Sequence, residues 1–138
     1  MKVAELMTER VWTLAPDKRL YHASALMERH GIRHIPVVDS EGHLLGIVSD
    51  RDVKRHINSG FDTERETVAD RLNMLVTLGD LMATDVVVCT RDTEARAAAR
   101  LLLTRHVSAL PVVDPQTRRL QGIVSTSDFL AHFLDAGI

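Results

Sequence analysis

Aromatic residues and cysteine are both scarce in this sequence, and each scarcity excludes something. Aromatics make up only 4% of the 138 residues, so the core must be built from aliphatic side chains. The single cysteine, Cys89, excludes an intrachain disulfide framework and fits a reducing compartment. No apolar run approaches the ~20 residues of a membrane-spanning helix, and the N-terminus lacks the apolar stretch of a secretion signal. We therefore expect a cytoplasmic protein with no membrane partner.

Acidic and basic residues nearly balance in this sequence. Seventeen basic and 19 acidic residues leave a net charge of −2, so we expect no nucleic-acid partner. The sequence also lacks a nucleophile elbow, a Walker loop and a metal-ligand cluster, which argues against an enzyme. His30 and His34 are four residues apart, but Gly31 is expected to end the helix between them, so we predict no metal site.

An internal repeat organises the chain. Leu6-Met7 aligns with Leu81-Met82, and residues 35–39 align with residues 110–114, both with the same offset in sequence number. After one inserted residue, the stretch that begins Gly46-Ile47-Val48-Ser49 aligns with the one that begins Gly122-Ile123-Val124-Ser125. Two repeats are too few for an open-ended solenoid, which needs at least ~3. The repeat therefore predicts a pseudo-symmetric pair.

The pattern within each repeat predicts an α+β unit in the order β-α-β-β-α. We assign residues 1–60 to repeat one, 61–77 to a helical linker and 78–138 to repeat two. In repeat one we expect Asp17 to cap the first helix and Gly31 to end it, and in repeat two we expect Asp92 or Thr93 as the cap. The predicted strands cover residues 11–14, 35–38, 44–49, 86–89, 110–113 and 120–125, and the later helix of each repeat covers 50–58 or 127–135. Apolar residues at helical spacing between 61 and 79 predict a further helix of about three turns.

The repeated junction Ser49…Asp52 and Ser125…Asp128 has two interpretations. As a structural feature, Ser-x-x-Asp at a helix start is close to a capping box, although the box prefers Glu or Gln at its third position. As a functional feature, the helix N-terminus is a natural anion site, and an aspartate can accept hydrogen bonds from both hydroxyls of a ribose. The recurrence in the same context, after Gly-Ile-Val-Ser, favours the functional interpretation.

Three stretches of repeat one resemble a CBS domain, a family named after cystathionine β-synthase. They are Leu6-Met7-Thr8, residues 32–39 and residues 46–52, and residues 78–134 resemble a second CBS domain. The chain is similar to stand-alone bacterial and archaeal CBS pairs, including the CBS part of acetoin-utilisation-type proteins. The resemblance implies a pseudo-two-fold tandem pair, clefts that bind adenosine compounds, and a homodimer.

The resemblance also implies roles for particular residues. Asp52 and Asp128 would bind ribose, with Ser49 and Ser125 beside the ribose or the first phosphate. The other implied ligand-binding residues fall into three groups: Val11, Thr13 and Val88 along the adenine; Ile35, Pro36, Leu110 and Pro111 as an apolar wall; Arg33, His34, Arg51 and Ser127 near phosphates. Arg33-His34 is replaced by Ser108-Ala109 in repeat two, and Asp50-Arg51 by Thr126-Ser127, so we expect the Arg51 copy to prefer charged phosphates.

We therefore expect a non-catalytic sensor of adenosine nucleotides (AMP, ADP or ATP) with no obligatory cofactor. It would act as a homodimer on a downstream protein that the sequence does not name. The alternatives are a ligand-independent dimerisation or scaffold module and a pair that binds S-adenosylmethionine, and turnover of nucleotide ranks last. Trp12 either stacks on adenine or covers the core, and Leu130 and Phe133 of the last helix could face a second copy.

Overall fold

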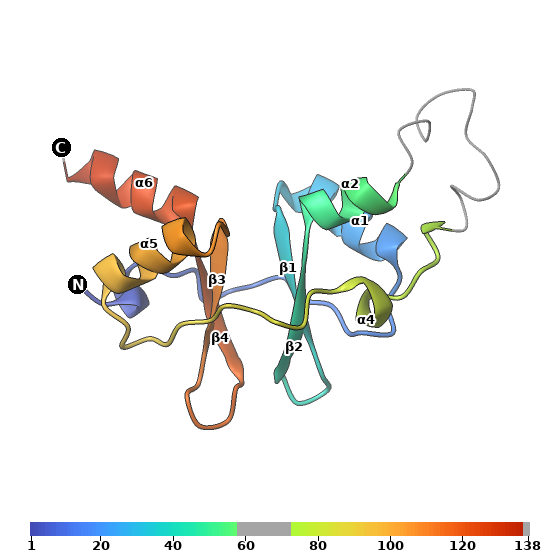
Figure 1. Cartoon of the computed structure of the whole chain (residues 1–138), viewed down its shortest axis with the longest axis horizontal. Coiled ribbons are helices and arrows are strands. Elements are labelled where there is room, and N and C mark those ends of the chain that lie inside the picture. The colour runs from blue at the N-terminus through green and yellow to red at the C-terminus, as the bar shows by residue number, and fades with distance from the viewer. Residues whose placement is uncertain (58–72, 137–138) are drawn as a thin grey trace. The chain divides into compact units, whose positions relative to one another are not determined.

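The computed structural model of this chain describes residues 1–57 and 73–136, and its elements follow the predicted repeat (Figure 1). The first repeat contains a short 3-10 helix η1, α1, β1, β2 and α2, and the second contains α4, α5, β3, β4 and α6. Their bounds are η1 Val3–Glu5, α1 Leu20–His30, β1 His34–Val38, β2 Leu44–Ser49, α2 Asp50–His56, α4 Leu78–Leu81, α5 Ala95–Thr104, β3 Ala109–Val113, β4 Leu120–Ser125 and α6 Thr126–Asp135. The α+β class and the two repeats are confirmed.

Contacts divide the chain into two compact units that are not continuous in sequence. The α1–α2 unit contains Trp12–Ser40 and Leu45–Val86, and the α5–α6 unit contains Met1–Val11, Glu41–Leu44 and Val87–Ile138. Each unit therefore takes its entry segment, Leu6-Met7 or Leu81-Met82, from the opposite repeat. The repeat boundaries at 60 and 78 remain a prediction about the sequence, while the packing units interleave.

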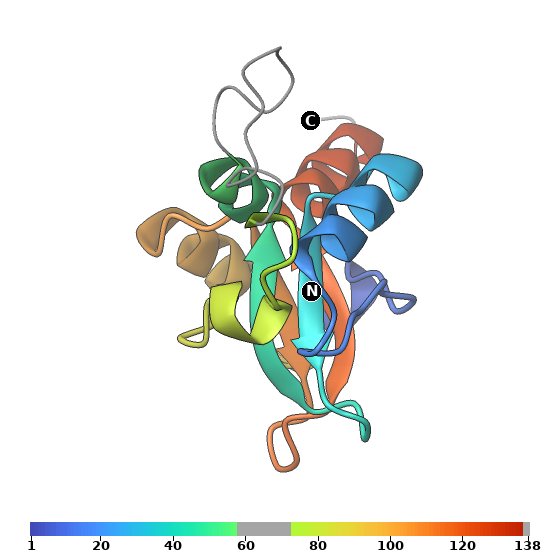
Figure 2. The same cartoon turned by 90° about the vertical axis from the view of Figure 1, so that its right-hand side faces the viewer.

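In the α1–α2 unit, β1 and β2 form a two-stranded sheet that single residues extend at both edges. Leu14 pairs in parallel with Val37 of β1, and Ala83 pairs antiparallel with Ile47 of β2. Figure 2 faces this unit and shows α1, α2 and α4 packed around the strand pair. The predicted extended segment at 11–14 thus contributes one bridging residue and no full strand.

The α5–α6 unit repeats this arrangement. Strands β3 and β4 are antiparallel from Ala109↔Ser125 to Val113↔Leu120, with an irregularity at the Val113 end. Cys89 pairs in parallel with Val112, and Thr8 pairs antiparallel with Ile123. The segment at 86–89 therefore has the same place beside its sheet as residues 11–14 have beside theirs.

Both cores are aliphatic, as the scarcity of aromatic residues predicts. Leu20, Ile35 and Val48 are fully buried in the α1–α2 unit, and Leu110 and Val124 in the α5–α6 unit. Burial of a side chain of this size stabilises the fold by about 1.5–3 kcal/mol.

Cys89 belongs to the second core and is only 4% exposed. Burial raises the pKa of its thiol to about 11, because the surroundings disfavour the thiolate. It is thus the small buried apolar residue that its isolation in the sequence indicates.

The predicted N-cap of the first helix is wrong in both repeats. Helix α1 begins at Leu20 with Arg19 as its N-cap, because Asp17 lies in a turn in which the Lys18 amide bonds to the Ala15 carbonyl. Helix α5 begins at Ala95 with Glu94 as its N-cap.

In the second repeat, the Thr93 hydroxyl accepts a hydrogen bond at 3.0 Å from the amide of Thr90, which precedes it by three residues. Local turns therefore use the polar residues that the sequence pattern assigns to the caps.

The helix ends are better predicted. Gly31 follows α1 in the left-handed conformation, with φ 64°, and the next amide, of Ile32, bonds to the Met27 carbonyl. In the second repeat His106 takes the equivalent place with φ 55°, and the Val107 amide bonds to the Leu102 carbonyl. The same termination is thus built without glycine, at a cost in backbone strain.

Some predicted features lie outside the described residues. They include Asn58 at the end of the second helix, the first part of the predicted 61–79 helix, and the stop at Gly137. Helix α2 is described to His56, with Ile57 as an extended C-cap. At the described end of the linker, Thr77 is extended and precedes the one-turn helix α4.

Two glycines allow the entry segments to contact the sheets. A Cβ atom on Gly46 would lie 2.7 Å from the Ala83 carbonyl oxygen, and one on Gly122 would lie 2.8 Å from the Thr8 carbonyl oxygen. Both contacts are with backbone that is hydrogen-bonded to the same strand, which limits how far it can retreat.

We predict that Gly46→Ala and Gly122→Ala each lower the free energy of unfolding by about 1–3 kcal/mol, the usual cost of overpacking. Urea denaturation would measure this, with Gln121→Ala in β4 as the control because Gln121 is partly exposed. Equal unfolding midpoints for Gly122→Ala and Gln121→Ala would contradict the close approach.

Candidate functional site

The repeated junction forms a complete capping box in both copies. The Ser49 amide donates to Asp52 Oδ2 at 2.8 Å, and the Asp52 amide donates to Ser49 Oγ at 3.2 Å. The corresponding distances between Ser125 and Asp128 are 2.7 and 3.4 Å. The structural interpretation is therefore correct for both copies. Such a cap stabilises a helix by about 0.5–2 kcal/mol.

The cap occupies only one oxygen of each carboxylate. The serine hydroxyl also donates to Oδ2, at 2.9 Å from Ser49 and 3.1 Å from Ser125. Within residues 1–57 and 73–136, no hydrogen bond reaches Oδ1 of Asp52 or Asp128. Each carboxylate thus keeps an acceptor oxygen that is held in place by its neighbour, so the capping and ligand-binding interpretations do not exclude each other.

A backbone hydrogen bond places the start of each first strand beside its capping box. The Asp50 amide donates to the Arg33 carbonyl at 2.8 Å, and the Thr126 amide donates to the Ser108 carbonyl at 3.0 Å. Residues 33–34 and 49–52 are therefore brought together within the α1–α2 unit. No side-chain pattern predicts this bond, because it joins two main-chain groups.

Each first strand contains a proline that interrupts its pairing with the neighbouring segment. The Leu14 amide bonds to the Pro36 carbonyl and the Val38 amide to the Leu14 carbonyl. A parallel ladder would continue with the amide of residue 36 donating to the carbonyl of Trp12, but proline has no N–H. Pro111 interrupts the pairing of Cys89 in the same way, so strand pairing does not use the carbonyl of residue 12 or 87.

The charges around the two boxes differ as the sequence predicts. Arg33 and Arg51 are exposed in the α1–α2 unit, where the charges of both act on the imidazole of His34. Ser127 takes the place of Arg51 beside the second box, and the hydroxyl of Thr126 donates to the Ser108 carbonyl at 3.3 Å. The two boxes thus differ in the residues beside them, with Arg33 and Arg51 at the first and Ser108 and Ser127 at the second.

His34 has a lowered pKa, chiefly because burial disfavours its charged form. Asp50 and Asp52 act in the opposite direction, and the two arginines add to the lowering. The imidazole is consequently neutral at pH 7.

The predicted site residues are divided between the two units. The α1–α2 unit holds Thr13, Arg33, His34, Ile35, Pro36, Ser49, Arg51 and Asp52, and the α5–α6 unit holds Val11, Val88, Leu110, Pro111, Ser125, Ser127 and Asp128. Ile35 and Leu110, predicted as parts of an apolar wall, are fully buried members of the two cores. Their side chains support the strands, and contact with a ligand remains a prediction.

Trp12 makes a contact that neither sequence interpretation included. Its ring stacks on His30 with 3.9 Å between the centroids and 13° between the planes, and the residue is 49% exposed. It therefore covers the end of α1 and is not part of the core.

Neither a metal-binding cluster nor a membrane-spanning helix occurs among residues 1–57 and 73–136. No three His, Cys, Asp or Glu side chains among these residues are grouped to hold a metal ion. Among the same residues, each helix is too short or too polar to span a bilayer.

Comparison with known proteins identifies the repeated unit. The family model described as "CBS domain" matches residues 3–59 and again residues 78–135. The chain belongs to the CBS domain family. It spans only 23% of one curated relative and 46% of another, so it matches the CBS part of longer chains, some of which are enzymes.

Solved structures support the assignment as a CBS pair. The acetoin utilization protein AcuB from Vibrio cholerae is 32% identical, with a TM-score of 0.82 over 99% of this chain and 92% of its own. CBSX2, solved in complex with AMP, is 27% identical, with a TM-score of 0.81 over 99% and 98%. The CBS pair of protein MJ0100, solved with 5′-methylthioadenosine and S-adenosyl-L-methionine, is 25% identical, with a TM-score of 0.79 over 96% and 99%.

The lowered pKa of His34 makes a prediction about this CBS pair. In the unfolded chain His34 has a pKa of about 6.5, and in the folded chain its pKa is lower. As the pH decreases below 6.5, the unfolded chain therefore binds a proton at His34 before the folded chain does, and the free energy of unfolding decreases. We expect the urea midpoint to fall less between pH 7.5 and 5.5 in His34→Gln than in the wild-type protein. His132→Gln, on exposed α6, is the control and should behave as the wild type. An equal fall in His34→Gln and wild type would show that His34 titrates normally.

Proposed function

We propose that this CBS pair is a regulatory module that binds an adenosine nucleotide (AMP, ADP or ATP) without catalysing a reaction. The observation that carries the proposal is Oδ1 of Asp52 and Asp128, which accepts no hydrogen bond from the described residues while the capping box fixes the other oxygen. A carboxylate can accept hydrogen bonds from the two hydroxyls of one ribose. Relatives of the same fold have been solved with AMP or with S-adenosyl-L-methionine, which both contain adenosine.

The interrupted strand pairing supports recognition of the base. The carbonyls of residues 12 and 87 cannot bond to Pro36 and Pro111, so main-chain groups of the two segments are available to a planar heterocycle. Val11, Thr13 and Val88 lie along these segments. We propose that adenine contacts this backbone while the ribose is held by the aspartate.

The phosphates are assigned by charge. Arg33 and Arg51 lie near the first capping box, and a guanidinium binds phosphate through two parallel hydrogen bonds. The second box has Ser108 and Ser127 in their places. We therefore propose that the site beside the first capping box prefers AMP, ADP or ATP. The site beside the second box would prefer ligands with less negative charge.

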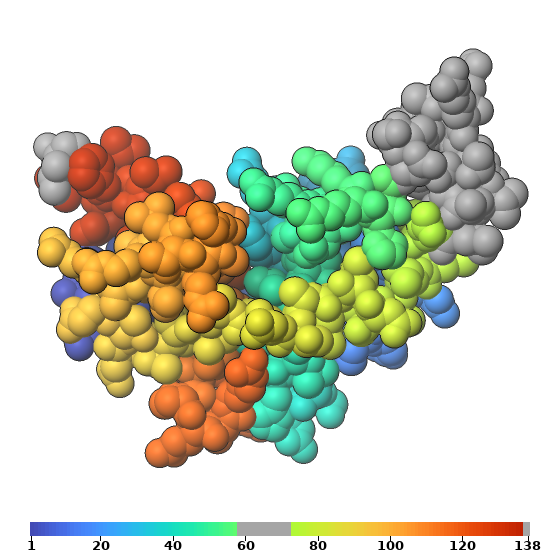
Figure 3. All heavy atoms as spheres, in the orientation of Figure 1, coloured from blue at the N-terminus to red at the C-terminus, as the bar shows by residue number. Residues whose placement is uncertain are grey.

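An exposed apolar face supports a homodimer. Helix α6 has no buried residue among its ten, and Leu130, Phe133 and Leu134 are 58%, 48% and 73% exposed. Figure 3 shows α6, in red, with its side chains on the surface. We call these three residues the α6 face and propose that it packs on a second copy.

The same face favours the alternative function, a dimerisation or scaffold module that needs no ligand. In that case the capping boxes only cap their helices. A CBS pair that binds S-adenosylmethionine is a third candidate, supported by the MJ0100 complex. In each case we propose a cytoplasmic protein that acts through a downstream partner, with energy sensing as the purpose if AMP and ATP compete.

Calorimetric titration with adenosine, AMP, ADP, ATP and S-adenosylmethionine tests the proposal. In Asp52→Asn and Asp128→Asn the remaining amide oxygen can still cap the helix, while the NH2 group replaces the second acceptor. We expect each substitution to weaken binding at the site beside its own capping box by about 10–100-fold. The reason is that a hydrogen bond to a charged group contributes about 1.5–3 kcal/mol.

Asp135→Asn is the matched control, because it removes the same charge from the exposed end of α6, outside both capping boxes. It should bind each compound as the wild type does. If none of the five compounds binds, the sensor proposal is wrong and the scaffold is favoured. If S-adenosylmethionine alone binds, the third candidate is correct.

For the dimer, we predict that Leu130→Glu/Leu134→Glu converts the protein to a monomer, because two carboxylates would be buried in the interface. Sedimentation equilibrium would measure this. Leu75→Glu is the control, since Leu75 is 45% exposed in the other unit. A wild-type monomer at millimolar concentration would contradict the proposed role of the α6 face.

A further inference from the structure

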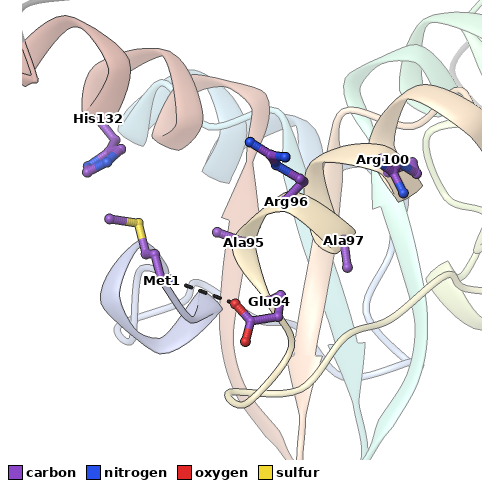
Figure 4. Close-up of a pocket in the computed structure, with 7 residues that line it drawn as sticks. All are labelled: Met1, Glu94, Ala95, Arg96, Ala97, Arg100 and His132. Atoms are coloured by element: carbon purple, nitrogen blue, oxygen red, sulfur yellow. Dashed lines mark ion pairs between the residues drawn. The ribbon is translucent and has the colours of Figure 1, made fainter.

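A second candidate site lies in the α5–α6 unit, away from both capping boxes. A hollow of about 600 Å3 lies between the N-terminal half of α5, the end of α6 and the start of the chain. Figure 4 shows Arg96 extending from α5 toward α6, Arg100 one turn further along α5, and His132 on α6 above Met1. The remaining lining residues are Met1, Glu94, Ala95 and Ala97.

The arginines of this hollow have no acidic partner among the described residues, and both are exposed. The one carboxylate in the lining, Glu94, is already used. Its Oε1 lies 2.6 Å from the Lys2 ammonium, and its Oε2 lies 3.7 Å from the Met1 amino nitrogen, as the dashed line in Figure 4 marks. The hollow therefore has an uncompensated positive charge from Arg96 and Arg100.

The placement of these charges is unfavourable for the helix by itself. Both arginines lie in the first two turns of α5, where the helix dipole favours anions and disfavours cations. They are also four residues apart, so they lie on one face and repel each other. No residue of α5 itself is acidic, and the N-cap Glu94 is already paired with Lys2 and the Met1 amino group. A bound anion would offset both.

We propose that Arg96, Arg100 and His132 form a binding site for a phosphate-type dianion, such as the phosphate group of a small metabolite. The two guanidinium groups supply forked donors that match phosphate oxygens, and the imidazole of His132 supplies a further donor from α6. The volume suits a ligand of metabolite size. The site uses none of the residues assigned to adenosine, so it is an additional anion site on the CBS pair.

Calorimetry of the full chain with inorganic pyrophosphate, at ionic strength held constant with NaCl, tests this site. We expect Arg96→Gln/Arg100→Gln to weaken pyrophosphate binding at least tenfold. Glutamine is a good helix former and both positions are exposed, so the variant should fold. The control Arg105→Gln/Arg119→Gln removes the same charge from exposed positions outside the hollow and should bind as the wild type.

Two further measurements separate this site from the nucleotide site. Uncharged adenosine should bind equally well to the wild type and to Arg96→Gln/Arg100→Gln. Pyrophosphate should still bind at the hollow in Arg33→Gln/Arg51→Gln, which lacks the arginines assigned to the nucleotide phosphates. The inference is wrong if pyrophosphate does not bind the wild type, if Arg96→Gln/Arg100→Gln and its control bind it equally, or if loss of Arg33 and Arg51 abolishes it.

Discussion

The fold depends on a hydrogen-bonded pair, serine and aspartate three residues apart, where a strand becomes a helix. In both copies one carboxylate oxygen accepts hydrogen bonds from the serine, and the serine hydroxyl oxygen accepts a hydrogen bond from the aspartate amide. This reciprocal arrangement fixes the aspartate, because any rotation would break bonds at a helix N-terminus. The residue that stabilises the helix is therefore also a rigid acceptor, and a rigid acceptor loses little entropy when it binds a ligand.

The two copies of this capping box have different surroundings. The first box has Arg33 and Arg51 near it, and His34 is kept neutral largely by burial. The second has hydroxyl groups in place of these charges, and it belongs to the unit that carries the apolar α6 face and the arginine-lined hollow. One repeat thus concentrates charge at its capping box, while the other places its exposed apolar and cationic groups on its helices. The two repeats therefore have the same backbone arrangement but different groups on their surfaces.

The sequence predicted the parts of this structure that depend on local pattern. Short aliphatic runs located both hairpins, and Gly31 located the end of α1, because a left-handed residue is needed there. The starts of α1 and α5 were predicted wrongly, because Asp17 and Thr93 can satisfy turns as well as caps. The exchange of entry segments could not be predicted, since Leu6-Met7 and Leu81-Met82 have the same pattern and either could pack on either sheet. The predicted site residues depend on the resemblance, and the structure adds the free oxygen and the interrupted strand pairing.

The exchange of segments gives the proposed base-binding segments a special place in the chain. Thr8 pairs with β4 and Leu14 with β1, so residues 9–13 cross from one unit to the other. Ala83 pairs with β2 and Cys89 with β3, so residues 84–88 make the second crossing. In the proposed function, adenine contacts the backbone of these crossings. In that proposal, a ligand with different affinities for two conformations of the protein would shift the equilibrium between them.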